Sequence, residues 1–139
     1  MASTVPMYAS LIRQADMDAG AINHALNVCI SPTQLTNAYV SPEISFDRTS
    51  RYTGSLPMGT HLAIPLSVNL NAHSFQSQIG AMVAKTMQTY GAFLLDRGGP
   101  NRFTIRTEKN VTSTLLTNAS DTGADLDMNW ILSQLQIVH

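Results

Sequence analysis

Charged residues are scarce in this chain of 139 residues. Lys and Arg number 8, Asp and Glu number 9, and together they make up 12% of the sequence, about half the roughly 25% usual in soluble domains. The formal net charge is −1. No run of basic residues occurs, which excludes the electrostatic surface that nucleic acids require. We therefore expect no nucleic-acid partner.

Cysteine and long apolar runs are lacking as well. Cys29 is the single cysteine, which excludes an intrachain disulfide and a cysteine-based metal site. Because Cys29 lies in an apolar segment, we expect it to be a small core residue. No window reaches the apolar length of a membrane span. We therefore expect no membrane partner. The first residues also lack the charged and apolar regions of a signal peptide.

The histidines do not form a metal-binding pattern. The sequence contains four of them: His24, His61, His73 and His139. No two are spaced by two or four residues, the intervals that place two ligands on one face of a strand or helix. We therefore expect neither a metal site nor any other cofactor.

The remaining composition favours a compartment outside the cell. Ser, Thr, Asn and Gln take the place of charged residues, and Gly and Pro divide the chain into short segments. This pattern is typical of an extracellular or virion β-domain. Release by cell lysis, as for a virion part, would require no signal peptide. A length of 139 residues fits a single domain over the whole of residues 1–139.

The clearest folding unit runs from Phe75 to Arg106. Apolar residues recur at steps of three and four from Phe75 to Tyr90, which predicts a helix of about residues 75–90. Ser74 is placed to cap its start and Gly91 to end it. The apolar run after Gly91, the DRGGPN turn and the alternation around residues 103–105 then predict two strands.

Other segments predict short strands and loops. Ala21–Ile30 alternates at period two, which predicts a strand with His24 on its apolar face. Further strands are expected at residues 38–40, 61–64 and 111–116, with Pro65 ending the second of these. Glu43–Leu56 has no clear period and predicts a long surface loop. Leu126–Val138 predicts one closing helical turn followed by an extended tail.

These elements predict an α+β domain that is mainly antiparallel β. We expect six or seven short strands in a sandwich-like or curved sheet. The helix at about residues 75–90 is the one substantial helix and should cover a face or an end of that sheet.

Three segments together resemble a known group of proteins. They are VPMYASLIRQADMDAGAINHAL (5–26), LPMGTHLAIPLSVNL (56–70) and MVAKTMQTYGAFLLDRGG (82–99). As a set they look like a family of largely uncharacterised secreted bacterial proteins, common in actinomycetes, with phage-borne relatives. The resemblance implies a β-rich fold and covers the C-terminal part of the family's architecture. It implies no assigned activity.

Candidate catalytic residues can be named only by residue type. A polysaccharide lyase or hydrolase needs a base, a proton donor and charge neutralisation, or paired carboxylates. His24, Tyr39, Arg48 and His61 could supply the first three roles. For each, a core or surface role is the simpler interpretation. For binding a glycan, Tyr39 and Tyr52 could stack on sugar rings, and Arg51 could donate hydrogen bonds.

Three functional hypotheses follow from the sequence. The first is a non-enzymatic structural or interaction domain of a phage particle or secreted assembly, with glycans as candidate ligands. It would associate with copies of itself or with a larger protein. The second is a carbohydrate-active enzyme, or part of one. The third is a carbohydrate-binding module. The absence of a catalytic motif favours the first.

Overall fold

The structure is a computed structural model that describes residues 10–43, 45–117 and 123–138. His139, the start of the 5–26 segment and most of the 117–125 loop therefore lie outside the described residues. The strands are β1 (Leu26–Ile30), β2 (Leu35–Tyr39), β3 (Leu56–Met58), β4 (His61–Ala63), β5 (Ala92–Arg97), β6 (Thr104–Ile105) and β7 (Gln136–Ile137). The α-helices are α1 (Gln14–Ala19), α2 (Gln78–Thr89), α3 (Thr114–Thr117) and α4 (Ala124–Gln134), and short 3-10 helices span Pro32–Gln34 and Leu70–Ala72.

The fold is α+β, and its main sheet is mixed. Five strands lie in the order β6-β1-β5-β4-β7, and β2 and β3 form a separate two-stranded sheet. The central pair β1–β5 is parallel, whereas β1–β6, β4–β5 and β4–β7 are antiparallel. The prediction of a mainly antiparallel sheet is therefore wrong at the centre. The reason is connectivity, because β1 reaches β5 through a long crossover that contains α2 rather than through a hairpin.

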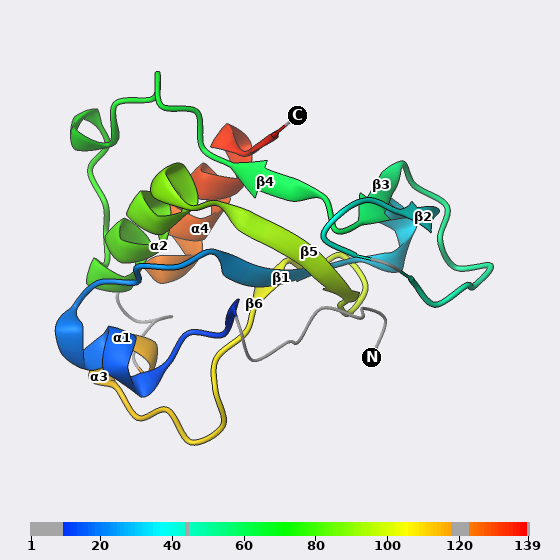
Figure 1. Cartoon of the computed structure of the whole chain (residues 1–139). Coiled ribbons are helices and arrows are strands. Elements are labelled where there is room, and N and C mark those ends of the chain that lie inside the picture. The colour runs from blue at the N-terminus through cyan, green and yellow to red at the C-terminus, as the bar shows by residue number, and fades with distance from the viewer. Residues whose placement is uncertain (1–9, 44, 118–122, 139) are drawn as a thin grey trace.

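A helical layer covers the sheet. In Figure 1, α2 and α4 lie side by side against it, while β2 and β3 extend away from these helices. The described residues thus pack helices against the main sheet, as predicted for the helix at about residues 75–90, but they do not form a clear sandwich. β1 is buried at all five positions, as expected for a central parallel strand covered on both faces.

Helix α2 is the best-predicted element. Its start lies at Gln78, three residues later than the sequence pattern indicates, because Ser77 and not Ser74 is the N-cap. The Ser77 hydroxyl accepts a hydrogen bond from the backbone N–H of Gly80 at 3.0 Å. The predicted stop is confirmed, because Gly91 follows the helix at φ 74°, in the left-handed region that favours glycine.

Helix α4 extends over 11 residues, where the sequence predicts only one closing turn. Its Asp127 carboxylate is fully buried and accepts hydrogen bonds from the backbone N–H groups of Gln76 and Ser77, each at 2.8 Å. The Ser77 hydroxyl donates a third bond at 2.6 Å. A Cβ atom added at Gly80 would overlap this carboxylate. Asp127 therefore joins α4 to the start of α2.

Two further predictions about elements are wrong, and one is confirmed. The predicted strand at 111–116 instead contains α3, and the segment before Leu26 is not strand. β4 ends at Ala63, shortly before Pro65, as predicted. Within the described residues, no helix has the length and apolar character needed to span a membrane.

Candidate functional site

His24 lies between α1 and β1, outside any strand, so its predicted position on an apolar strand face is wrong. Its Nε2 is 2.9 Å from Oδ2 of Asp16, and its Nδ1 is 2.9 Å from the carbonyl oxygen of Ala25. The same Asp16 carboxylate accepts the backbone N–H of Arg13 at the start of α1. Both ring nitrogens thus have partners within the chain, and His24 links α1 to the start of β1.

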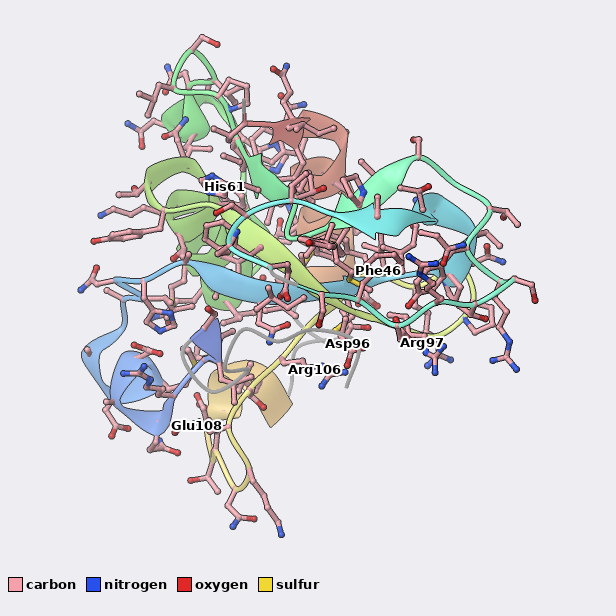
Figure 2. All side chains as sticks on the ribbon, turned by 45° about the vertical axis from the view of Figure 1, so that its right-hand side comes forward. Phe46, His61, Asp96, Arg97, Arg106 and Glu108 are labelled. Atoms are coloured by element: carbon pink, nitrogen blue, oxygen red, sulfur yellow. The ribbon has the colours of Figure 1, made fainter. Side chains whose placement is uncertain are left out.

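His61 lies on β4 and has a similarly structural environment. Its ring stacks on Phe93 of β5 with centroids 4.5 Å apart, and its Nε2 is 3.0 Å from the carbonyl oxygen of Tyr90. Figure 2 shows His61 well separated from Phe46 on the irregular loop. Figure 1 places α1 and β2 at opposite ends of the molecule. The predicted catalytic residues are therefore not gathered into one cleft.

Tyr39 and Arg48, by contrast, share a surface. Tyr39 is 48% exposed, and its ring centroid lies 5.9 Å from that of Phe46. The guanidinium carbon of Arg48 lies 5.6 Å from the Phe46 centroid, within the range of a cation–π contact. Asn37 and Thr49 line a shallow hollow together with Arg48. We name Asn37, Tyr39, Phe46, Arg48 and Thr49 the Tyr39 surface.

The irregular loop that carries Phe46 and Arg48 is tied down at several points. The Asn37 side chain donates to the carbonyl of Thr49 and accepts from its backbone N–H, both at 3.2 Å. The Asp47 carboxylate accepts a hydrogen bond from the Tyr52 hydroxyl. It also lies 3.1 Å from NH1 of Arg97, at the end of β5. The loop is thus attached to β2 through Asn37 and to the end of β5 through Asp47.

Tyr52 does not fit its predicted role. The residue is only 6% exposed, so its ring offers no open face for stacking on a sugar. Burial, with the hydrogen bond to Asp47 as a second cause, raises the pKa of the Tyr52 hydroxyl well above its usual range. Arg51 is exposed, and its backbone N–H donates to the Thr49 hydroxyl at 3.3 Å. Tyr52 therefore positions the loop, whereas Arg51 is accessible beside the Tyr39 surface.

Cys29 belongs to a polar cluster near the ends of β1, β5 and β6. Arg106 Nε donates to Cys29 Sγ at 3.1 Å, and Arg106 Nη2 donates to Asp96 Oδ2 at 3.0 Å. Asp96 and Arg106 lie close together in Figure 2. Burial raises the pKa of the Cys29 thiol, and the nearby guanidinium only partly opposes this effect. The thiol is therefore neutral near pH 7, which argues against a nucleophilic thiolate.

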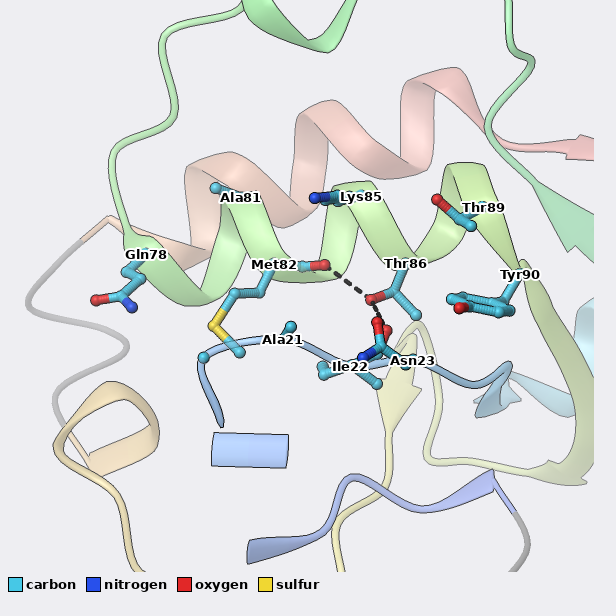
Figure 3. A pocket seen from close by; sticks show the side chains of 11 residues that line it. Ala21, Ile22, Asn23, Gln78, Ala81, Met82, Lys85, Thr86, Thr89 and Tyr90 are labelled. Carbon is cyan, nitrogen blue, oxygen red and sulfur yellow. Dashed lines mark hydrogen bonds between the residues drawn. The ribbon is translucent and has the colours of Figure 1, made fainter. Parts of the chain in front are cut away.

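A groove along α2 is the site that the sequence does not indicate. It has a volume of about 420 Å³ and separates one face of α2 from residues 20–23. We name it the α2 groove, and its lining includes Ile22, Asn23, Gln78, Met82, Lys85, Thr86, Thr89 and Tyr90. Figure 3 shows Gln78 at one end, Tyr90 at the other and Lys85 between them. In the sequence, the exposed helix residues Gln78, Lys85 and Thr89 give no sign of a site, because the opposite wall is formed by residues 20–23, far away in the chain.

Metal binding is not supported in the part of the chain that the structure describes. There, no group of three or more His, Cys, Asp or Glu side chains could hold a metal ion.

Comparison of the chain with protein-family models, with curated proteins and with solved structures gives no match. The family resemblance inferred from the three segments therefore stays a prediction.

Proposed function

We propose that this chain is a non-enzymatic interaction domain of a phage particle or secreted assembly, and that it contacts glycans through the Tyr39 surface. One observation carries the proposal. The fold brings Tyr39, from β2, and Arg48, from the irregular loop, into contact range of the same ring, that of Phe46. Both side chains are exposed. They are nine positions apart in sequence, so the fold and not the local sequence brings them together.

The chemistry of this surface suits a sugar. An exposed tyrosine presents an apolar ring face together with a polar hydroxyl. Arg48 adds several hydrogen-bond donors in a fixed plane. A sugar ring combines apolar C–H faces with hydroxyl groups, so it can use both kinds of contact at once. The loop's attachment through Asp47 and Asn37 reduces the conformational entropy lost on binding.

The enzyme hypothesis is less well supported. A general base needs a ring nitrogen or carboxylate directed at its substrate, whereas both nitrogens of His24 have partners within the chain. The aromatic stack of His61 on Phe93 lies apart from the Tyr39 surface. A carbohydrate-active enzyme built on these residues would require them to be brought together by another chain.

The glycan proposal is tested by screening the purified chain on a glycan array and measuring affinities for any ligand found. Tyr39→Ala and Arg48→Ala should each weaken binding by about tenfold or more, the effect of losing one good contact. Arg102→Ala, which removes an exposed arginine from the turn after β5, should leave affinity within about twofold. Unchanged binding by Tyr39→Ala, or no binding by the wild-type chain, would refute the glycan contact.

A second observation favours self-association. β7 lies at one edge of the main sheet, and Ile137 in this strand and Val138 directly after it are 44% and 46% exposed. An exposed apolar strand at a sheet edge can pair with the same strand of a second copy, because a two-fold interface uses one element twice. Light scattering should then show a dimer for the wild-type chain and a monomer for Ile137→Lys. A wild-type monomer at high concentration would contradict this candidate.

A further inference from the structure

The α2 groove has rigid walls that are joined at its floor. The Thr86 hydroxyl on α2 is within hydrogen-bond distance of two carbonyl oxygens, 3.0 Å from that of Ile22 and 2.9 Å from that of Met82. The first contact crosses from the helix to the opposite wall (Figure 3). Ile22, Met82 and Thr86 are all buried. The groove therefore exists before any ligand arrives, and little ordering is required for binding.

The lining has an unusual combination of side chains. Asn23, Gln78, Lys85 and Thr89 are exposed in the groove, and Tyr90 is 40% exposed at its end. Lys85 provides the single charge, since no acidic residue lines the groove. None of the ion pairs among the described residues includes Lys85. The site thus presents one uncompensated cation together with amides, hydroxyls and a ring.

Lys85 can be approached from two sides. Ala81, Lys85 and Thr89 form one row on α2, at steps of four residues, and they also line a second hollow of about 860 Å³ on the other side. The helix between Gln78 and Tyr90 spans roughly 18 Å at 1.5 Å per residue. The two hollows and this row offer space for an oligomer rather than for a single small ion.

We infer that the α2 groove binds an oligosaccharide that carries carboxylate groups, such as a short uronic-acid polymer. The Lys85 ammonium would pair with a carboxylate, and the Tyr90 ring would stack on a neighbouring sugar. The amides of Asn23 and Gln78 would exchange hydrogen bonds with hydroxyl groups. A nucleic acid would need several cations, whereas Lys85 is the one cation that lines the groove.

This inference is independent of the Tyr39 surface, which lies on β2 and the irregular loop. It is tested by calorimetric titration of the chain with oligogalacturonate, with a neutral malto-oligosaccharide and with an oligoglutamate peptide. Oligogalacturonate should bind at least about tenfold more tightly than either other probe. Its affinity should fall as salt is added, because an exposed charge contact is screened.

Substitutions then locate the site. Lys85→Ala should weaken oligogalacturonate binding by about tenfold or more, whereas Lys85→Arg, which keeps the charge, should retain most of it. Tyr90→Ala should also weaken binding, with Tyr90→Phe close to wild type. Lys109→Ala, an exposed lysine outside the groove, is the matched control and should change affinity by less than about twofold.

Four outcomes would overturn the inference. The first is no binding of oligogalacturonate. The second is equal binding by wild type and Lys85→Ala with unchanged melting temperatures, which would place the ligand elsewhere. The third is equal affinity for oligoglutamate, which would reduce the groove to a general carboxylate site. Loss of binding by Tyr39→Ala but not by Lys85→Ala would support the Tyr39 surface alone and reject the α2 groove.

Discussion

The carboxylate of Asp47 lies 3.1 Å from NH1 of Arg97, which joins the irregular loop to the end of β5. The same carboxylate accepts the hydroxyl of Tyr52. Phe46 and Arg48 flank Asp47 in sequence, so the two partners of Asp47 determine where those side chains lie. A buried tyrosine and a strand-end arginine therefore hold the residue that lies between Phe46 and Arg48 in sequence.

The first prediction concerns Asp47 as a positioning residue. Asp47→Ala should weaken binding of any glycan ligand of the Tyr39 surface about as much as Arg48→Ala does, because the loop loses its attachment to β5. The free energy of unfolding should fall by about 1–3 kcal/mol, mostly from the unsatisfied Tyr52 hydroxyl. Affinity measured by calorimetry and stability measured by urea denaturation check the two effects.

Arg97→Gln provides the comparison for Asp47→Ala. It removes the ion pair, which is partly exposed, and leaves the Tyr52 hydrogen bond in place, so stability should fall by less than about 1 kcal/mol. If Asp47→Ala kept wild-type glycan affinity, the loop would be held by its other contacts. The positioning role of Asp47 would then be rejected.

The second prediction concerns Asp127, which is fully buried and accepts three hydrogen bonds from Gln76 and Ser77. Asp127→Ala leaves buried donors unsatisfied at the start of α2. We expect a loss of about 2–4 kcal/mol in the free energy of unfolding, measured by urea denaturation. Asp125 is exposed and lies one position after the start of α4. Asp125→Ala should therefore lower the free energy of unfolding by less than about 0.5 kcal/mol.

An Asp127→Ala variant as stable as wild type would show that α2 does not depend on this cap. Circular dichroism would then distinguish an intact α2 from a helix that begins later. In either case the glycan affinity of the Tyr39 surface should remain, because that surface lies on a different part of the fold.

Asp127 also explains why α4 is hard to predict. A surface helix is normally recognised by buried apolar residues at regular steps. In α4 the buried residues are Asp127 and Ile131, while Leu126 is 66% exposed and Leu132 is 37% exposed. The apolar pattern is therefore out of register with the face that packs. The tertiary hydrogen bonds from Gln76 and Ser77 make a buried aspartate favourable.

Other features follow from local signals, and these are predicted well. Helix α2 has a regular apolar stripe, and Gly91 ends it with a positive φ. Pro65 limits β4 because it cannot donate to the sheet. The parallel pairing of β1 with β5 is a long-range contact, and a period-two pattern does not indicate strand direction. That is why the antiparallel prediction fails at the centre of the sheet.

The two candidate sites differ in how far the sequence reveals them. Tyr39 and Arg48 can be named by residue type, although their common surface depends on the fold of the loop between them. The α2 groove combines Asn23 with Lys85, which are 62 positions apart. No local pattern joins such residues. Their proximity depends on the packing of residues 20–23 against α2.

The third prediction concerns pH. Burial and Asp47 raise the pKa of Tyr52 above its ordinary value of 10.0, so the folded chain keeps this proton to higher pH than the unfolded chain. Above pH 10.0 the unfolded state therefore binds fewer protons, and the free energy of unfolding falls as pH rises. The stabilisation that Tyr52 contributes is complete below pH 10.0, and it is lost as the pH rises towards the raised pKa of the folded chain. Melting temperatures measured across this range should decline.

Tyr52→Phe removes the titrating hydroxyl and should reduce that alkaline decline. Tyr39→Phe removes an exposed hydroxyl instead and should keep the wild-type pH dependence. If Tyr52→Phe and wild type lost stability in parallel above pH 10.0, titration of Tyr52 would not be the cause.

The last prediction concerns the thiol of Cys29. Cys29 is 1% exposed, and burial raises its pKa above the usual 9.0 even though the Arg106 guanidinium opposes the shift. The reactive thiolate is therefore scarce near neutral pH, and reagents have little access to it. A disulfide reagent should label the folded chain far more slowly than the chain in concentrated guanidinium chloride. Rapid labelling of the folded chain at neutral pH would contradict this prediction. It would show that Arg106 stabilises a reactive thiolate at Cys29.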